Sequence, residues 1–304
     1  MRGTSHGVGR ISTGPVEEGV ESVCRAAACD HPDVAVGLAV LGVTAVFLLV
    51  VGVALSRLDD AREAVAVEAS RTRAEREAFE RFSRRVARLE PGELAAATPV
   101  GAGTNVLATA RTVDDGEGLA AAREAYRETV MSTAHYDEEY DETLVENVAE
   151  EFSGAVAGAL VEQGGALTPA LRATLARGAE RASDERADLL STLETERSAL
   201  TDAESTLAPA VEAGERVVDG DLADAEYGDL IAEHDRLEWH ERRVETLLTD
   251  RQARIHDTEG ERAHWFEYLY DSLPTPYPVL SVGAGTLTLL EDAKSTVATV
   301  AGDR

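Results

Sequence analysis

The chain has 304 residues, of which 57 are acidic and 29 basic, so its formal net charge is −28. A surface of that charge repels the phosphates of nucleic acids, which argues against DNA or RNA as a partner. Aromatic residues make up only 5 % of the chain, and the abundance of alanine, glutamate and arginine favours an all-α fold of long helices over a thick mixed core.

The charge also indicates the solvent for which the protein is built. Lys294 is the only lysine in the chain. At molar salt the Debye length falls to about 3 Å, so the repulsion between surface carboxylates is largely screened. An acidic surface almost without lysine therefore predicts adaptation to high salt. The alternative is an ordinary acidic protein of a high-GC organism.

Residues 1–33 predict a disordered N-terminal tail. This tail holds the only two cysteines, Cys24 and Cys29. If the tail lies outside the cell, the two thiols can close a small disulfide loop. If it lies inside, they are plain thiols, and the sequence assigns them no role.

Residues 34–55, "VAVGLAVLGVTAVFLLVVGVAL", form an apolar run without a charged side chain. As a helix such a run reaches about 33 Å, which is enough to cross the hydrocarbon core of a bilayer. We therefore expect a transmembrane helix over 34–55, with the lipid bilayer as its partner.

The basic residues around this run predict its orientation. On the N-terminal side only Arg25 lies close, whereas the C-terminal side carries a series of arginines, at Arg57, Arg62, Arg71, Arg73 and Arg76. Because positively charged flanks stay in the cytoplasm, we expect a single-pass protein of the cell membrane with a cytoplasmic C-terminal domain.

Residues 56–90 predict a juxtamembrane helix that continues the apolar run. Uncharged residues recur there every seven positions, at Leu58, Val65, Thr72, Phe79 and Val86. That spacing is typical of a coiled-coil seam, and self-association through 58–89 is one interpretation. Glu68 and Glu75 fall in the companion row of the seam and weaken that interpretation.

Residues 91–116 are rich in glycine, alanine, threonine and proline and predict a linker. Beyond it, residues 117–304 predict an acidic helical domain with coiled-coil character. Leucines at seven-residue spacing indicate an antiparallel hairpin of two long helices, over about 169–217 and 222–258.

Three local signals refine this domain. "LTPALRATL" at 167–175 places a threonine cap before a proline in the first turn, which predicts a helix start. Pro209 lies inside the first arm of the hairpin and is expected to kink or break it. After a proline-rich crossing, a last helix is expected over about 279–300.

The most concentrated polar stretch is "HYDEEYDE" at residues 135–142. On a helix, four potential metal ligands in it share one face, because they are spaced i, i+3, i+4 and i+7: His135, Glu138, Glu139 and Glu142. Oxygen ligands at such spacing can hold a divalent cation. The composition favours the alternative, a solvated helix start with Tyr136 and Tyr140 packed on a neighbour, so we predict no metal site.

Three motifs that carry catalysis are missing from the sequence: it has no P-loop, no G-x-G-x-x-G after a strand, and no H-E-x-x-H. We therefore predict no catalytic residue and no cofactor. The expected function is that of a membrane-anchored helical scaffold or protein-interaction module with an unknown protein partner. A membrane-linked sensor or regulatory transducer is one alternative, and a metal-dependent enzyme that uses the 135–142 cluster is another.

Three stretches carry a resemblance to a family: "AYRETVMSTAHYDEEYDETLVENVAEEF" at 125–152, "LTPALRATL", and "EYLYDSLPTPYPVL" at 267–280. They resemble an uncharacterised family of membrane-anchored, acidic coiled-coil proteins from halophilic archaea. The resemblance covers about residues 57–300. It implies location and architecture without an activity or functional residues, and it implies that "HYDEEYDE" and "YPVL" belong to one folded head.

Overall fold

The computed structural model describes residues 32–91, 116–136, 140, 142–161, 165–220, 222, 224–262 and 264–303, with the side chains of 32–55, 259 and 261 outside that description. The regular structure of these residues is helical, and no strand occurs among them. The prediction of an all-helical chain is confirmed to that extent. The predicted tail with Cys24 and Cys29, and nearly all of the predicted linker, lie outside the described residues.

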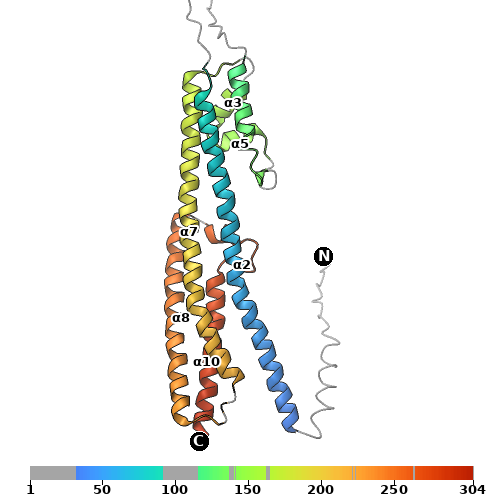
Figure 1. The fold of residues 1–304 in the computed structure, drawn as a ribbon, viewed down its shortest axis with the longest axis vertical. Helices are drawn as coiled ribbons and strands as arrows, with labels where there is room; N and C mark the ends of the chain where they lie inside the picture. The colour runs from blue at the N-terminus through green and yellow to red at the C-terminus, as the bar shows by residue number, and fades with distance from the viewer. Residues whose placement is uncertain are drawn as a thin grey trace, which may run out of the picture. The chain divides into compact units, whose positions relative to one another are not determined.

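The described helices are labelled in Figure 1: α2 Pro32–Arg88, α3 Glu117–Arg127, α5 Leu144–Glu151, α6 Gly154–Val161, α7 Pro169–Asp219, α8 Tyr227–Glu261, α9 Trp265–Leu269 and α10 Pro278–Gly302. The start predicted at "LTPALRATL" is found, because the Thr168 hydroxyl accepts a hydrogen bond from the Leu171 amide at 3.1 Å and Pro169 opens α7. Pro209 does not end α7, which runs on to Asp219.

The predicted transmembrane helix is corrected by the structure. Residues 34–55 are the first part of α2, a single helix of 57 residues. A helix that crosses a bilayer needs about 20 consecutive apolar residues. Of the helices described here, none combines the length and the apolar character that crossing a membrane requires. Taken over all 57 residues, α2 is not an apolar helix, because arginine and glutamate are frequent in its second part. The single-pass membrane location deduced from residues 34–55 is therefore wrong as well.

The chain divides into two compact units. Unit 1 comprises 1–58, 203–261 and 277–304, and unit 2 comprises 59–202 and 262–276. The division separates "HYDEEYDE", in unit 2, from "YPVL", in unit 1. The implication that both stretches share one folded head is therefore not met.

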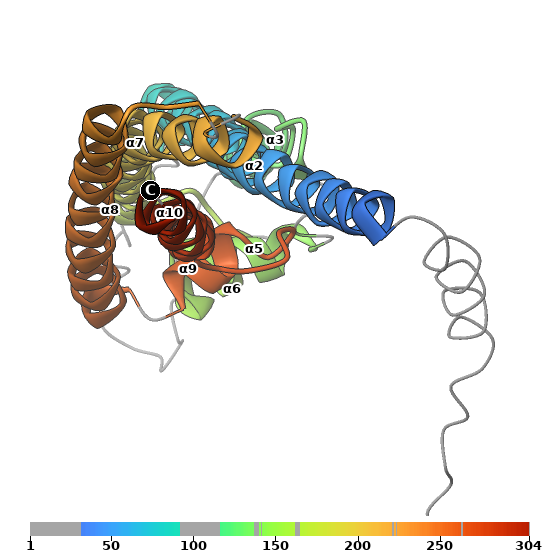
Figure 2. The same ribbon diagram turned by 90° about the horizontal axis from the view of Figure 1, so that it is seen from below.

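Unit 1 is built around the packing of α8 against α10 (Figure 2). The repeating apolar residues of α8 are fully covered, at Leu230, Leu237 and Val244. The Nζ atom of Lys294 on α10 donates to Oε2 of Glu241 on α8 at 2.5 Å. Gly214 of α7 lies so close to α10 that a Cβ atom there would meet Cγ of Leu289 at 2.5 Å. The unit therefore depends on close helix contact and one partly buried ion pair.

Unit 2 has an aromatic core. The rings of Phe82 on α2 and Tyr126 on α3 meet edge to face at 5.0 Å between centroids, and Phe152 lies 6.0 Å from Tyr126. The predicted seam of α2 supplies one wall of this core. Its residues in unit 2 are 0–2 % exposed within a single chain, so these side chains offer no apolar surface to a second copy.

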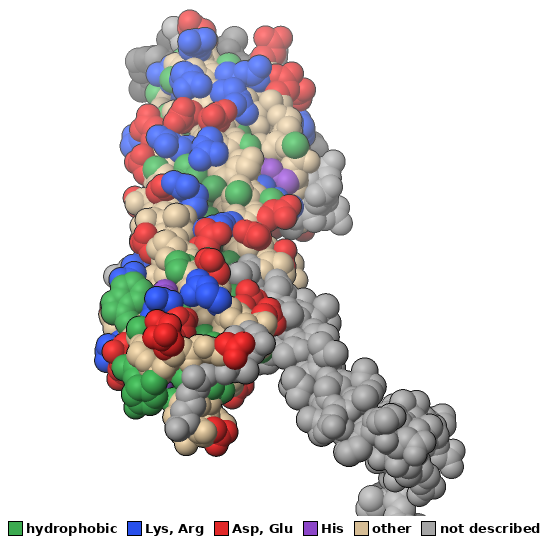
Figure 3. All heavy atoms as spheres, turned by 60° about the horizontal axis from the view of Figure 1, so that its bottom comes forward, with side chains coloured by type: hydrophobic (Ala, Val, Ile, Leu, Met, Phe, Trp, Pro, Cys, Tyr) green, Lys and Arg blue, Asp and Glu red, His purple; other side chains and the backbone are tan. Residues whose placement is uncertain are grey.

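The outer surface is charged. Figure 3 shows acidic side chains interspersed with arginines on one face. Several of these are pairs one helical turn apart, such as Arg81 with Glu77 at 3.7 Å. Exposed pairs of this kind contribute about 0–1 kcal/mol each, so the fold depends mainly on its two cores.

Candidate functional site

A network of charged side chains lies inside unit 2. It joins three helices through Glu75 of α2, Glu151 of α5 and Arg186 of α7. Nε of Arg186 donates to Oε2 of Glu75 at 3.0 Å, while its two terminal nitrogens donate to both oxygens of Glu151 at 2.9 and 2.6 Å. All three side chains are no more than 15 % exposed. The guanidinium thus holds two carboxylates from different helices with the forked geometry that only arginine offers.

The surroundings keep Arg186 charged. Burial alone would lower its pKa, but the hydrogen bonds and negative charges of Glu151 and Glu75 outweigh burial and hold the pKa above its ordinary value. The same guanidinium lies 4.9 Å from the ring centroid of Phe79, which adds a cation–π contact. The Arg186 guanidinium therefore stays charged, and its contacts fix its orientation.

His135 and Tyr140, from the "HYDEEYDE" stretch, complete this network. Oε1 of Glu75 lies 2.9 Å from Nε2 of His135 and accepts a hydrogen bond from the Tyr140 hydroxyl at 3.0 Å. His135 is only 7 % exposed. The ring of Tyr136 packs on that of Tyr140 at 5.3 Å. The two tyrosines thus pack on each other, and the expected solvated face is wrong for His135.

A second polar chain lies beside the first. The hydroxyl of Tyr126 donates to Oδ1 of Asn147 at 2.6 Å, and Nδ2 of Asn147 donates to Glu142 at 2.9 Å. Burial, followed by the nearby charge of Glu151, raises the pKa of Tyr126 above its ordinary value. The tyrosine therefore stays a neutral hydrogen-bond donor.

The space enclosed by these groups is small. A cavity of about 10 Å³ lies among Glu75, Tyr136, Asn147, Glu151 and Arg186. Such a volume has room for about one water molecule and for no substrate. The buried network thus supports the fold and does not form a pocket for chemistry.

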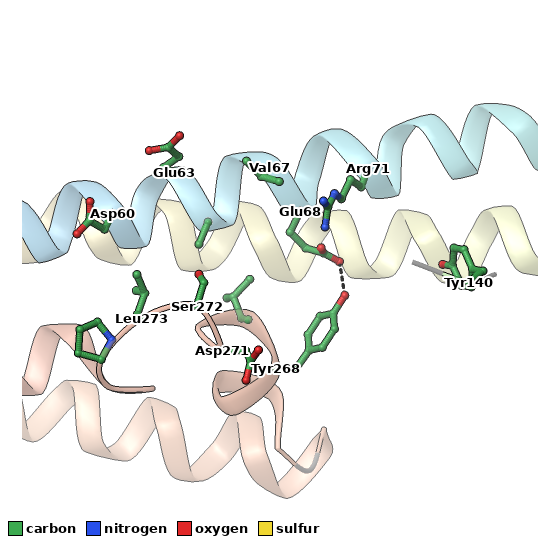
Figure 4. A pocket seen from close by; sticks show the side chains of 13 residues that line it. Asp60, Glu63, Val67, Glu68, Arg71, Tyr140, Tyr268, Asp271, Ser272 and Leu273 are labelled. Carbon is green, nitrogen blue, oxygen red and sulfur yellow. Dashed lines mark hydrogen bonds between the residues drawn. The ribbon is translucent and has the colours of Figure 1, made fainter. Parts of the chain in front are cut away.

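A larger open groove lies on the same unit, with a volume of about 830 Å³. One wall is α2, which contributes Asp60, Glu63, Val67, Glu68 and Arg71. The other wall is the segment 268–274 (Figure 4). The Tyr268 hydroxyl donates to Oε1 of Glu68 at 2.9 Å and thereby links the two walls.

Exposed apolar groups line this groove beside the charged ones. Tyr268 is 60 % exposed and Val67 is 45 % exposed. Leu273 and Pro274 add apolar surface on the wall opposite α2. Tyr140 lines the groove as well and also donates to Glu75. Through this tyrosine, the groove and the buried network share a side chain.

Two of the four candidate metal ligands, His135 and Glu142, lie among the described residues, and they contact different partners. His135 contacts Glu75, and Glu142 contacts Asn147. Glu138 and Glu139 lie outside the described residues. In the part of the chain that the structure describes, no group of three or more His, Cys, Asp or Glu side chains is placed to hold a metal ion.

Sequence reasoning missed Arg186, Tyr268 and the two acidic partners on α2. A signal for the latter was present, because Glu68 and Glu75 interrupt an otherwise buried seam. A carboxylate in such a row needs a partner, and these partners lie 200 and 111 positions away, at Tyr268 and Arg186. No local pattern marks either of them.

Comparison with known proteins supports one part of the resemblance, namely that the chain belongs to an uncharacterised family. A family model described as a domain of unknown function, DUF7260, matches residues 56–294. No curated protein and no solved structure matches the chain. The matched region includes both the groove and the buried network, and the chain therefore belongs to the uncharacterised DUF7260 family.

Proposed function

We propose that this protein is a helical protein-interaction module without catalytic activity, which receives a segment of a partner protein in the groove between α2 and residues 268–274. The observation that carries the proposal is the groove itself, with its half-exposed Tyr268 and Val67. Tyrosine is enriched at protein–protein contacts because it buries a large apolar ring and retains a polar hydroxyl. A groove with such a ring at its rim suits a bound chain segment.

The base of the groove is held in place before any partner arrives. Its α2 wall belongs to a helix whose other face is buried in the core of unit 2, at Val65, Thr72 and Phe79. Tyr268 is oriented by its hydrogen bond to Glu68. Preformed sites lose less conformational entropy on binding than mobile ones, which favours affinity.

A photo-crosslinking residue tests this function. It is placed at Val67 inside the groove and, in a matched control, at Glu245 on the exposed surface of α8. In the native cells we expect one stoichiometric protein adduct from position 67, which disappears with Tyr268→Ala and does not form from position 245. Adducts that are the same from both positions, or that survive Tyr268→Ala, contradict the proposal.

The acidic composition supports a proposal about working conditions. With 57 acidic residues and a single lysine, the folded chain concentrates negative charge that salt would screen. We propose that the protein works at molar salt, as the resemblance to halophilic proteins implies. The free energy of unfolding should then rise between 0.2 and about 2 M KCl because screening removes self-repulsion. A flat or falling dependence contradicts this.

A regulatory transducer is a second candidate, favoured by the shared position of Tyr140. A segment that enters the groove meets this ring, whose hydroxyl is bonded to Glu75 beside His135 and Arg186. Groove occupancy can therefore reach the buried network. Hydrogen exchange of α5 and α7 amides, with and without partner, tests this: changed protection beyond the groove supports the transducer, and changes confined to the groove contradict it.

The repeating apolar residues support a further structural proposal. Leu193, Leu200 and Leu207 recur every seven residues along α7, and each is fully buried. That spacing is the one used by coiled coils. We propose coiled-coil packing for α7, which gives the module long, stiff helices on which to present its binding surface.

A further inference from the structure

We propose that the groove selects an extended segment in which arginine side chains alternate with apolar ones. This inference rests on the proposed function, because it names the chemistry of the partner that the groove would take. It follows from three features of the groove: the balance of its charges, their spacing along α2, and the exposed tyrosine ring beside them.

The charge of the lining favours a cationic partner. Carboxylates come from Asp60, Glu63 and Glu68 on α2 and from Asp271 on the opposite wall, against the single guanidinium of Arg71. An acidic segment placed there would meet four like charges, which costs affinity and slows encounter. A basic segment meets complementary charge on both walls (Figure 4).

The spacing of these charges matches an extended chain. Asp60 and Glu68 are separated by eight residues of α2, which is about 12 Å along a helix that rises 1.5 Å per residue. In an extended peptide, side chains on one face recur every two residues, so residues four apart are about 13 Å apart on that face. Two basic residues four positions apart can therefore reach both ends of the α2 wall.

Between those two ends the lining includes apolar side chains as well as Glu63. Val67 contributes its side chain next to Glu68, and Leu273 faces the groove from the opposite wall. A peptide residue midway between the two basic ones points to this surface. The pattern that fits is thus basic, any residue, apolar, any residue, basic.

The tyrosine ring favours arginine over lysine. Tyr268 is 60 % exposed, and its hydroxyl is held by Glu68 at 2.9 Å. A guanidinium stacks flat on an aromatic ring and at the same time forms two parallel hydrogen bonds to a carboxylate, whereas an ammonium group does neither. Ring and carboxylate lie side by side here, so an arginine that stacks on the ring of Tyr268 also lies beside the negative charge of Glu68.

A peptide titration tests the inference. The full-length protein is titrated with a fluorescein-labelled peptide that repeats Arg-Ser-Leu-Ser, and with matched peptides that carry lysine or glutamate in place of arginine. We expect binding of the arginine peptide, weaker binding of the lysine peptide and none of the glutamate peptide. The titration is carried out in about 2 M KCl, the proposed working condition, where screening leaves only close ion pairs and ring stacking to provide the affinity.

Variants locate the binding. Asp60→Asn combined with Asp271→Asn removes two carboxylates without changing shape, and we expect the affinity to fall about tenfold or more. Tyr268→Ala should weaken binding of the arginine peptide more than that of the lysine peptide. The matched control, Glu245→Gln with Asp250→Asn on exposed positions of α8, changes the net charge equally and should leave the affinity unchanged.

The outcomes separate this inference from the proposed function. Equal loss in the groove variant and the α8 control means general attraction by net charge and overturns the inference, as does equal binding of the glutamate peptide. If the peptides fail while crosslinking at Val67 still depends on Tyr268, the groove binds a partner of different chemistry. If both fail, the function fails with the inference.

Discussion

Nε2 of His135 lies 2.9 Å from Oε1 of Glu75, although 60 positions separate the two residues in the chain. The same carboxylate receives Tyr140 and Arg186. A stretch with the composition of a metal site thus supplies partners to a buried carboxylate. Its role in the fold is to join the segment before α5 to α2.

Arg186 should be the most sensitive charged position of unit 2. Replacing it in Arg186→Leu leaves Glu75 and Glu151 buried without their shared partner. Breaking one side of a buried ion pair costs about 3–5 kcal/mol, because an uncompensated charge remains. We expect a fall of that size in the free energy of unfolding, measured by urea denaturation.

Arg197 provides the control for this prediction. It also forms a short ion pair, with Glu194 at 2.6 Å, but both side chains are about 60 % exposed. Arg197→Leu should change the free energy of unfolding by less than about 1 kcal/mol. Similar losses of unfolding free energy in the two variants would show that the buried network contributes no more to stability than an exposed ion pair does.

The hydroxyl of Tyr126 offers a second test of the buried polar groups. Tyr126→Phe keeps the ring in the aromatic core but removes the donor to Asn147. A buried acceptor left without its donor costs about 1–3 kcal/mol. Tyr227, which is 59 % exposed on α8, gives the matched control. Tyr227→Phe should unfold at the wild-type urea midpoint, and an equal shift in both variants would contradict the prediction.

Close helix contact in unit 1 predicts a cost at Gly214. A Cβ atom there would lie 2.5 Å from Cγ of Leu289, so Gly214→Ala forces α7 and α10 apart or moves the leucine. Overpacking of this kind costs about 1–3 kcal/mol. The measurement is the shift of the thermal midpoint, followed by circular dichroism.

Two further variants decide whether packing is the cause. Gly214→Ala combined with Leu289→Ala should recover part of the lost stability, because the second change makes room for the first. Gly228→Ala on α8 meets nothing within 4 Å and should stabilise the protein by about 0.5–1 kcal/mol, as alanine favours helix. If the double variant is no more stable than Gly214→Ala, steric contact is not the reason.

His240 predicts a pH dependence of stability. Burial lowers the pKa of His240 below the ordinary value of 6.5. The positive charges of Arg243, Arg216 and Arg236 lower it further, whereas the negative charge of Glu233 raises it. As the pH falls below 6.5, the unfolded chain takes up the proton first. The native state therefore loses stability from about pH 6.5 down to the lowered pKa of His240.

Unfolding free energies at pH 7.5, 6.5 and 5.5 check this prediction. The decrease on acidification should be smaller in His240→Gln than in the wild type, because glutamine does not titrate. Carboxylates contribute to the slope in both proteins, so the difference between them isolates the histidine. An NMR midpoint for His240 at or above 6.5 would refute the assignment.

Local signals in the sequence were enough to predict the long helices. The threonine and proline of "LTPALRATL" placed the start of α7, and the seven-residue spacing of its leucines predicted a long helix, because both signals act within one or two turns. The break that was one of the two effects expected at Pro209 did not occur. One lost hydrogen bond did not end a helix of 51 residues.

The candidate site was beyond such local reasoning. The two walls of the groove are linked by Tyr268 and Glu68, which lie 200 positions apart in the chain, and neither residue is unusual in its own neighbourhood. The composition of its stretch singled out His135 as a candidate site residue, but nothing in the sequence identified Glu75 as its partner. A carboxylate in a heptad row looks unfavourable until the arginine that binds it, here Arg186, is known. Periodicity along the chain predicts which residues share a helix face, but it does not predict which polar side chains pair across the fold.

The pairing of Lys294 with Glu241 has a practical consequence. This is the only side-chain amine of the chain, and it is 21 % exposed beside a carboxylate 2.5 Å away. Amine-reactive labels therefore have one internal target, and that target is protected while α8 and α10 stay packed. The rate at which Lys294 is modified, measured by mass spectrometry, therefore reports how often α8 and α10 separate, without any engineered probe.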